Sequence, residues 1–295
     1  MIGPGEVYAL SCAVAWAAAV ILFKKSGESL APFALNLFKN ALSLLLLGVT
    51  LWLTAAAWPG IPPSALLLML LSGVLGIGLG DTLYFHALNT IGASRMAVAQ
   101  TLYSPFVILL SMIFLGERLH WGQGAGVLLV LGGILLVTYV RQAARRADAA
   151  RTLRGVGQAA LAMLLMAAGI VMAKPLLERY DFLWVVALRI AGGLAGMLVE
   201  AALLGRFAAL PDAYRRVRHW PQVVAGAVVG SYLSMMLWLA GYKYTQASIA
   251  AVLNELAAVF ILGFAIVFLG ERPAARQIAG VMVAVSGVAM VIGLR

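Results

Sequence analysis

A few polar side chains interrupt stretches of sequence that are otherwise apolar, and they have the chemistry to bind a small solute or to carry a proton. Asp81 follows the glycine-rich run 76–80, and Glu255 follows Asn254 within an apolar segment. A carboxylate in such surroundings can titrate or receive an ammonium group, and Glu255 is the better candidate for proton coupling. Two other interpretations stay open: Asp81 hydrogen-bonds to backbone groups, or Glu255 forms a buried ion pair with a cation such as Arg189.

Two cations, Lys39 and Arg189, occupy matching positions in two apolar segments. Each lies about 10–12 Å in from the start of its segment if the segment is helical. Together they carry the charge to attract a carboxylate at either mouth of a cavity, or to take part in gating. The interpretation that the sequence favours is that both side chains reach back towards water at the segment ends, because long cationic side chains do this readily.

Aromatic residues far from the segment ends are the other material for a binding site. Flat rings with one polar atom suit moderately apolar substrates and ammonium groups. Tyr103 is the strongest of them, because it shares with Gln100, Ser104 and Pro105 a polar stretch where proline frees backbone carbonyls. His86 and Tyr232 are weaker candidates for the same wall. The residues predicted to bind substrate are Trp16, Asp81, Tyr84, Gln100, Tyr103, Trp238, Asn254 and Glu255, and those predicted to serve coupling or gating are Glu255, Asp81, Lys39 and Arg189.

These residues belong to a chain of 295 residues, of which 63% are hydrophobic and 11% are charged. Soluble domains carry about 25% charged residues, so this chain has too few charges to cover a water-exposed surface. A soluble enzyme, a nucleic-acid binder and a disordered chain are thereby excluded, and a polytopic membrane protein remains. The single cysteine, Cys12, and three scattered histidines give no basis for an intrachain disulfide, a metal site or a cofactor.

Ten segments are apolar enough to cross the hydrocarbon layer, which takes about 20 residues of helix. The predicted fold class is therefore an all-α integral membrane protein with ten transmembrane helices. These helices are predicted at residues 5–23, 31–54, 64–88, 93–115, 122–140, 155–173, 182–204, 220–242, 247–269 and 275–293.

The basic residues outside these helices gather on one side of the predicted topology. Lys and Arg in short loops favour the cytoplasm, so both termini are predicted to lie outside an inner membrane of the bacterial type. The same asymmetry accounts for the net charge of +10, so the expected partners are the lipid bilayer and a small-molecule substrate, without nucleic acid. The residues on the predicted cytoplasmic side are Lys24, Lys25, Arg95, Arg141, Arg145, Arg146, Arg151, Arg154, Arg206, Arg215, Arg216, Arg218, Arg272 and Arg276.

The two halves of the chain resemble each other. The run Phe-Leu-Gly-Glu-Arg at 114–118 recurs at 268–272, and sliding 87–141 onto 241–295 gives 18 identities in 55 positions. The glutamate and arginine of this run are expected to anchor helix ends at the membrane interface. Upstream, an offset of 150 pairs Lys39 with Arg189 and Gly80 with Gly230. The sequence therefore predicts a first repeat over 1–140, a basic cytoplasmic linker over 141–154 and a second repeat over 155–295.

Each repeat contains five helices, and five is odd, so the second copy enters the membrane inverted relative to the first. Inverted repeats are typical of secondary transporters, because two conformations of one unit can exchange between the halves around a site at the bilayer midplane. The architecture therefore favours a transporter.

These features resemble the drug/metabolite transporter superfamily, and within it the EamA-type exporters. The resemblance rests on ten helices in two copies, on Ala-Ser at 93–94 and 247–248 opening helices four and nine, and on the repeated Phe-Leu-Gly-Glu-Arg run that closes them. It covers essentially the whole chain. It implies uncoupled or proton-coupled movement of small metabolites, often outward, through a central cavity lined by helices from both halves.

The expected function is export of small neutral or zwitterionic metabolites, with amino acids, aromatic ones included, as the leading class. Efflux of lipophilic cations is the alternative if Glu255 or Asp81 faces an aromatic cavity unpaired. A membrane-embedded enzyme is not expected, because no catalytic constellation occurs on any one predicted helix face. A passive channel would instead require a continuous ring of polar residues through the pore. Nothing in the residues requires an oligomer, so a monomer is the working expectation.

Overall fold

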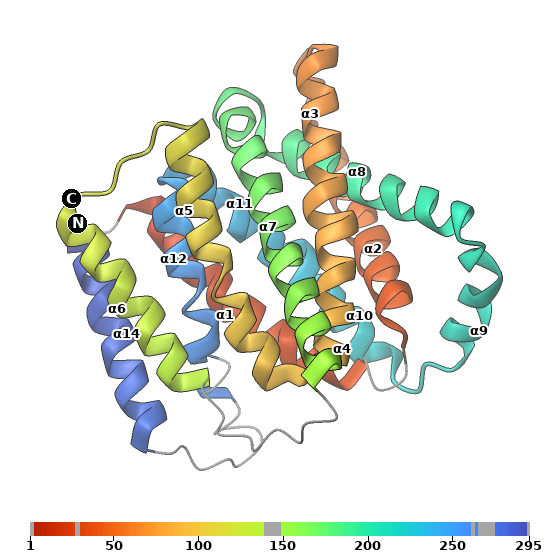
Figure 1. Cartoon of the computed structure of the whole chain (residues 1–295). Helices are drawn as coiled ribbons and strands as arrows, with labels where there is room; N and C mark the ends of the chain where they lie inside the picture. The colour runs from red at the N-terminus through yellow and green to blue at the C-terminus, as the bar shows by residue number, and fades with distance from the viewer. Residues whose placement is uncertain (1–2, 27–29, 139–148, 261–262, 265–274, 294–295) are drawn as a thin grey trace.

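The computed structural model describes residues 3–26, 30–138, 149–260, 263–264 and 275–293, and all regular structure within these ranges is helical (Figure 1). The first half contains α1 (Pro4–Ser26), α2 (Pro32–Leu53), α3 (Pro63–Gly73), the π-helix η1 (Val74–Gly80), α4 (Asp81–Gln100), α5 (Tyr103–Phe114) and α6 (Trp121–Thr138). The second half contains α7 (Ala149–Arg179), α8 (Phe182–Leu203), the short helices η3 (Arg206–Ala209) and α9 (Leu210–Arg215), α10 (Trp220–Ala227), the π-helix η4 (Val228–Leu233), α11 (Ser234–Tyr244), α12 (Ala247–Asn254) and α14 (Ala275–Gly293).

The described ranges contain six helical stretches that are long and apolar enough to cross a membrane, together with four shorter apolar helices. Each of the ten predicted segments corresponds to one of them, which confirms the all-α membrane fold. The start of α7 at Ala149 lies inside the stretch 141–154 that the sequence predicts as a linker. The boundaries of the two repeats themselves stay a prediction.

The third and fourth predicted helices differ from the structure in where the chain breaks. Helix α4 continues through the predicted loop at 89–92 as far as Gln100, and the turn falls at 101–102. The ninth predicted helix is also interrupted, because α12 ends at Asn254 and a turn occupies 255–256. These two turns lie 154 residues apart. Apolar length alone does not reveal such breaks, because both sides of the break remain buried.

The repeat is visible in the helix bounds. Helices α2 and α8 begin 150 residues apart and end 150 residues apart, which supports the pairing of Lys39 with Arg189. The two π-helices instead begin at Val74 and Val228, 154 residues apart. The four extra residues fall between α8 and η4, where the second half carries η3 and α9. The predicted pairing of Gly80 with Gly230 is therefore wrong, and Gly76 is the residue equivalent to Gly230.

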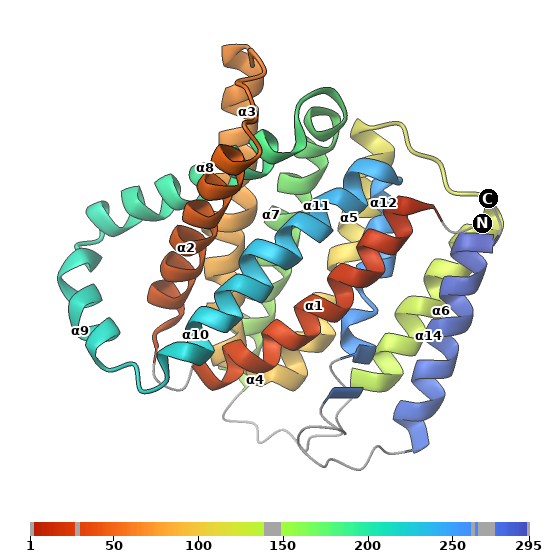
Figure 2. The same cartoon turned by 180° about the vertical axis from the view of Figure 1, so that it is seen from behind.

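Helices α6 and α14 lie side by side at the edge of the molecule and run in opposite directions (Figures 1 and 2). A Cβ atom added to Gly126 would lie 2.8 Å from the carbonyl oxygen of Gly287, and one added to Gly133 would lie 2.6 Å from that of Gly280. Gly126 is equivalent to Gly280, and Gly133 to Gly287, at the offset of 154. The contact between Gly126 and Gly287 therefore has an equivalent in the contact between Gly280 and Gly133. Such a reciprocal arrangement is what a two-fold axis between the repeats produces.

The glycine-rich run 76–80 forms part of η1, where the helix widens to π geometry. It packs against α7 and α8 at very short range: a Cβ at Gly169 would lie 3.1 Å from the Cα of Gly76, and one at Gly78 would lie 3.1 Å from the carbonyl oxygen of Gly193. The absence of side chains at these glycines therefore permits both the close helix approach and the local π geometry. The start of α1, the start of α6 and the end of α14 share one end of the molecule (Figure 1).

Candidate functional site

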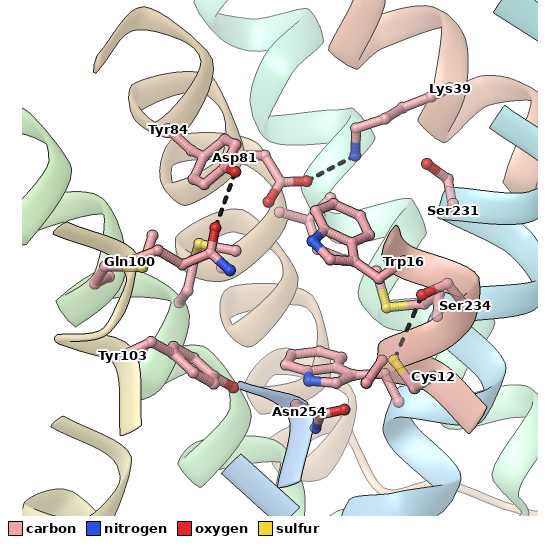
Figure 3. A pocket seen from close by; sticks show the side chains of 18 of the residues that line it. Cys12, Trp16, Lys39, Asp81, Tyr84, Gln100, Tyr103, Ser231, Ser234 and Asn254 are labelled. Atoms are coloured by element: carbon pink, nitrogen blue, oxygen red, sulfur yellow. Dashed lines mark hydrogen bonds and ion pairs between the residues drawn. The ribbon is translucent and has the colours of Figure 1, made fainter. Parts of the chain in front are cut away.

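A cavity of about 130 Å³ lies between the two repeats (Figure 3). An apolar cavity of about this size can hold a benzene-sized molecule, so the enclosed space suits a small solute. Its wall includes all ten residues that the sequence predicts for binding, coupling or gating, although their roles stay a prediction. The lining residues are Cys12, Ala13, Trp16, Lys39, Gly76, Ile77, Asp81, Tyr84, Phe85, Gln100, Tyr103, Met163, Met166, Arg189, Gly230, Ser231, Ser234, Met235, Trp238, Asn254 and Glu255.

Most of this wall is built from equivalent residues of the two repeats, which places the cavity on the axis that relates them. The offset of 150 pairs Ala13 with Met163, Trp16 with Met166 and Lys39 with Arg189. The offset of 154 pairs Gly76 with Gly230, Ile77 with Ser231, Asp81 with Met235, Tyr84 with Trp238, and Gln100 with Asn254. The positions of these lining residues are related by the symmetry of the repeats, but the side chains at equivalent positions differ in charge and polarity, as Asp81 and Met235 do.

Lys39 and Asp81 form an ion pair at the wall of the cavity (Figure 3). The Lys39 Nζ lies 2.7 Å from Asp81 Oδ2 and 3.5 Å from Asn40 Oδ1, and the lysine is only 2% exposed. The expectation that Lys39 reaches out to water is therefore wrong, because α2 packs against α4 and brings the carboxylate within reach. The carboxylate of Asp81 is therefore paired with Lys39. The interpretation that Asp81 hydrogen-bonds to backbone groups does not describe this contact.

Arg189 is 1% exposed, so it does not reach out to water either. Its Nη1 donates to Ser72 Oγ at 3.0 Å and to the carbonyl oxygen of Gly169 at 2.7 Å. The other two guanidinium nitrogens, Nε and Nη2, are buried and have no hydrogen-bond partner among the residues that the structure describes. The Arg189 Cζ lies 5.9 Å from the centroid of the Trp238 ring, which gives the cation an aromatic neighbour.

Glu255 occupies the turn after α12 and is 4% exposed. Its Oε1 accepts a hydrogen bond from Ser104 Oγ at 2.9 Å, across the interface between the two repeats. Among the residues that the structure describes, no cation lies within ion-pair distance of this carboxylate. The alternative that Glu255 pairs with Arg189 is therefore wrong, because that guanidinium is directed at Ser72 and Gly169.

Aromatic side chains enclose the remaining space. The Tyr84 hydroxyl donates to Gln100 Oε1 at 3.0 Å, and the Tyr103 and Tyr242 hydroxyls lie 2.8 Å apart (Figure 3 shows the first pair). The Trp238 ring lies 6.5 Å from that of Tyr103. The amide nitrogen and oxygen of Asn254 are both buried, and neither finds a hydrogen-bond partner within the described ranges.

Two weaker candidates from the sequence do not line the cavity. His86 is exposed, and the Tyr232 hydroxyl is 2.6 Å from that of Thr50. Conversely, the cavity is lined by Cys12, whose Sγ lies 3.4 Å from Ser234 Oγ, and by the two methionines Met163 and Met166 of α7, and no sequence pattern points directly to these residues. The repeat offset was the available signal for the methionines, since Met166 is equivalent to Trp16.

As far as the described residues go, the cavity therefore combines a guanidinium with two nitrogens that donate no hydrogen bond, a carboxylate without an ion-pair partner, an unsatisfied amide and several aromatic rings. Such a set can bind a small solute that carries both charges. Within the described ranges, no group of three His, Cys, Asp or Glu side chains is placed to hold a metal ion.

Comparisons with known proteins agree on the family. The EamA-like transporter family matches residues 3–139 and 153–293, which is nearly the whole chain in two copies. The chain is 26% identical over 272 residues to the pseudopaline exporter CntI of Pseudomonas aeruginosa, covering 91% of this chain and 89% of that protein. It is 22% identical over 285 residues to an uncharacterized transporter of Archaeoglobus fulgidus, covering 96% of both.

A solved crystal structure with 18% sequence identity matches the fold with a TM-score of 0.79 over 99% of both chains. This likeness concerns the fold alone. The family match in two copies, the paired helices and the helical membrane architecture lead to one conclusion: the chain belongs to the EamA-like transporter family of the drug/metabolite transporter superfamily, and it is a multi-pass membrane transporter.

Proposed function

We propose that this chain exports small zwitterionic metabolites, amino acids above all and aromatic ones included, by alternating access about the cavity between its repeats. The observation that carries the proposal is the pairing of opposite charges with aromatic walls in one enclosed space. Arg189 offers donors to the carboxylate of the substrate, and Glu255 offers an acceptor to its ammonium group. The rings of Trp238 and Tyr103 offer an apolar surface to its side chain.

The movement that we propose is a rocking of α3–α5 and α10–α12 about the cavity. Each of these bundles contains a π-helix, η1 or η4, close to residues that line the cavity. A π-turn disrupts the regular helical ladder, and such sites are where helices change direction. The wall comes from both repeats of a single chain, so we propose the monomer as the transporting unit.

Outward direction is part of the proposal. It is supported by the relatives named as pseudopaline exporters, which act on their own substrate. We also propose that both termini lie outside the inner membrane, a proposal supported by the gathering of the basic residues on the other side of the predicted topology. Fusions of alkaline phosphatase and of green fluorescent protein to the C-terminus test this: an active phosphatase and a dark fluorescent protein are expected, and the opposite pattern would reverse the topology.

Efflux of lipophilic cations is the second candidate. It is favoured by the carboxylate of Glu255, which lies in an aromatic cavity without a cation partner among the described residues. Arg189 argues against it, because a buried guanidinium in the same cavity repels a cationic solute.

Counterflow in proteoliposomes that contain the purified chain distinguishes the two candidates. Vesicles are loaded with an unlabelled amino acid and diluted into the radiolabelled one, with tetraphenylphosphonium in a parallel series. We expect saturable uptake of amino acids that related amino acids compete away. Uptake of tetraphenylphosphonium without uptake of any amino acid would replace the proposal by its alternative. An imposed pH gradient in a further series reports whether protons are coupled.

A further inference from the structure

Lys39 and Arg189 are equivalent residues, yet only one of them has a carboxylate as its neighbour. They occupy the same position in α2 and α8, whose bounds differ by 150 at both ends. Lys39 is paired with Asp81 at 2.7 Å. Arg189 has a hydroxyl and a backbone carbonyl as its partners, and none of the ion pairs among the described residues includes it.

The reason lies at the position equivalent to Asp81, which is Met235. Asp81 lies 7 residues after Val74, the first residue of η1, and Met235 lies 7 residues after Val228, the first residue of η4. Both residues line the cavity. Helix α8 packs against α11 as α2 packs against α4, so Met235 is carried on the element that would supply a counter-ion to Arg189. A thioether cannot neutralise a guanidinium.

The donors that Arg189 leaves unused have a definite geometry. Nε and Nη2 lie on the same edge of the planar guanidinium, and this edge presents two parallel N–H groups. Two parallel donors match the two oxygens of a carboxylate in a bidentate pair. Gly76 lies next to this edge, since a Cβ added there would be 3.7 Å from Nη2. A buried cation with an open fork is costly to leave without an anion.

We propose that the carboxylate of the substrate takes at Arg189 the place that Asp81 takes at Lys39. The inference rests on the proposed function and adds to it the group that the substrate must carry. The Lys39–Asp81 pair is internally neutral, so among the described residues that line the cavity Arg189 is the one cation left to receive an anion. The substrate class is therefore a compound with one carboxylate and an apolar or aromatic remainder. Phosphorylated compounds and dicarboxylates are disfavoured, because the described lining of the cavity offers no second unpaired cation to bind their additional negative charge.

Binding to the purified full chain in lipid nanodiscs, measured by calorimetry, tests this inference without transport. The probes are 3-phenylpropionate and its neutral isostere 3-phenylpropionamide. For the unmodified chain we expect the acid to bind about tenfold or more tightly than the amide, as a charge-assisted pair implies. Equal affinities for the two compounds, or no binding of the acid, would overturn the inference even if no variant folds.

The matched variants are Met235→Asp and Met235→Asn, which have the same shape and differ in charge. Met235→Asp supplies Arg189 with its own counter-ion, so the affinity for the acid falls about tenfold to a hundredfold, to the level of the amide. Met235→Asn keeps the preference for the acid. Equal behaviour of the two folded variants would contradict the inference. Size-exclusion elution and circular dichroism establish that both are folded.

The two proposals fail in different ways. If the chain transports amino acids and Met235→Asp behaves like Met235→Asn, the assignment of Arg189 is wrong and amino-acid export stands. If no amino acid is transported while the acid binds and depends on charge at position 235, the carboxylate site stands and the amino-acid proposal fails.

Discussion

Glu117 of the first repeat caps the first turn of α12 through Ser248 of the second repeat. Its Oε2 accepts hydrogen bonds from the Ser248 backbone nitrogen at 3.0 Å and from the Ser248 hydroxyl at 2.7 Å, while Oε1 accepts from the Ala247 nitrogen at 2.6 Å. Two motifs that recur in the sequence thus meet across the repeats. Glu117 therefore satisfies N–H groups at the beginning of α12 that have no acceptor within the helix. Its predicted role as an anchor at the membrane interface stays a prediction.

Removal of this cap should destabilise the protein. Glu117→Ala leaves three donors at the start of α12 without their acceptor, and loss of an N-terminal cap costs about 0.5–2 kcal/mol. Thermal unfolding of the purified protein in detergent measures the effect as a lowered midpoint. Asp212→Ala is the control, because the Asp212 side chain is 69% exposed and its ion-pair partner Arg215 is 82% exposed, so this surface pair contributes little to stability. Equal midpoints for the two variants would show that the cap contributes nothing.

Two adjacent glycines in α6 should respond differently to the same substitution. A Cβ at Gly133 would lie 2.6 Å from the carbonyl oxygen of Gly280, whereas one at Gly132 meets nothing within 4 Å. Gly133→Ala therefore forces α6 away from α14 and lowers the unfolding midpoint, while Gly132→Ala leaves it unchanged or raises it through helix propensity. Thermal unfolding of the two purified variants in detergent measures this difference in midpoint. Similar midpoints would mean that α6 and α14 do not pack at this crossing.

Two buried asparagines should also differ. The Asn36 Nδ2 donates to the Ile77 carbonyl oxygen and to Thr82 Oγ1, but the Asn254 amide in the cavity has no partner. Leucine at 36 breaks a satisfied network and lowers stability by about 1–3 kcal/mol, whereas leucine at 254 removes an unsatisfied amide and leaves stability equal or higher. Counterflow should fall in Asn254→Leu because the substrate loses a polar partner. Full transport in that variant would take Asn254 out of the binding site.

Glu255 should be required for proton-linked movement and dispensable for folding. Glu255→Gln removes the charge and keeps an oxygen that can accept the hydrogen bond from Ser104. We expect the pH-gradient dependence of transport to disappear while the thermal midpoint changes little. Ser104→Ala, which keeps the carboxylate, is the matched control and should retain the dependence. Unchanged pH dependence in Glu255→Gln would remove this residue from the coupling mechanism.

The sequence predicted which residues line the cavity better than it predicted their partners. The ten candidates were found because polar and aromatic groups within apolar segments are few, and two pairs of them, Lys39 with Arg189 and Gln100 with Asn254, matched at the repeat offsets. The pairing of Lys39 with Asp81 could not be found, because it depends on α2 packing against α4. For the same reason both deep cations were expected to reach water, since hydropathy reports the length of an apolar segment and not the direction of a side chain.

The chain breaks inside α4–α5 and after α12 were also beyond sequence reasoning. Pro105 lies in the first turn of α5, directly after the break at 101–102, but no proline marks the second turn at 255–256. There the backbone tightens through hydrogen bonds from Leu256 to Leu253 and from Ala258 to Glu255. These bonds depend on the surrounding packing, and so does the position of Glu255 at the cavity.

The most direct measurement of the central claim is a structure determined with an amino acid bound, at a concentration that saturates counterflow. The account predicts density for the amino acid inside the cavity between the repeats, with its apolar side chain against the rings of Tyr103 and Trp238. An amino acid bound outside this cavity, or an empty cavity under those conditions, would contradict the claim that the cavity is the transport site.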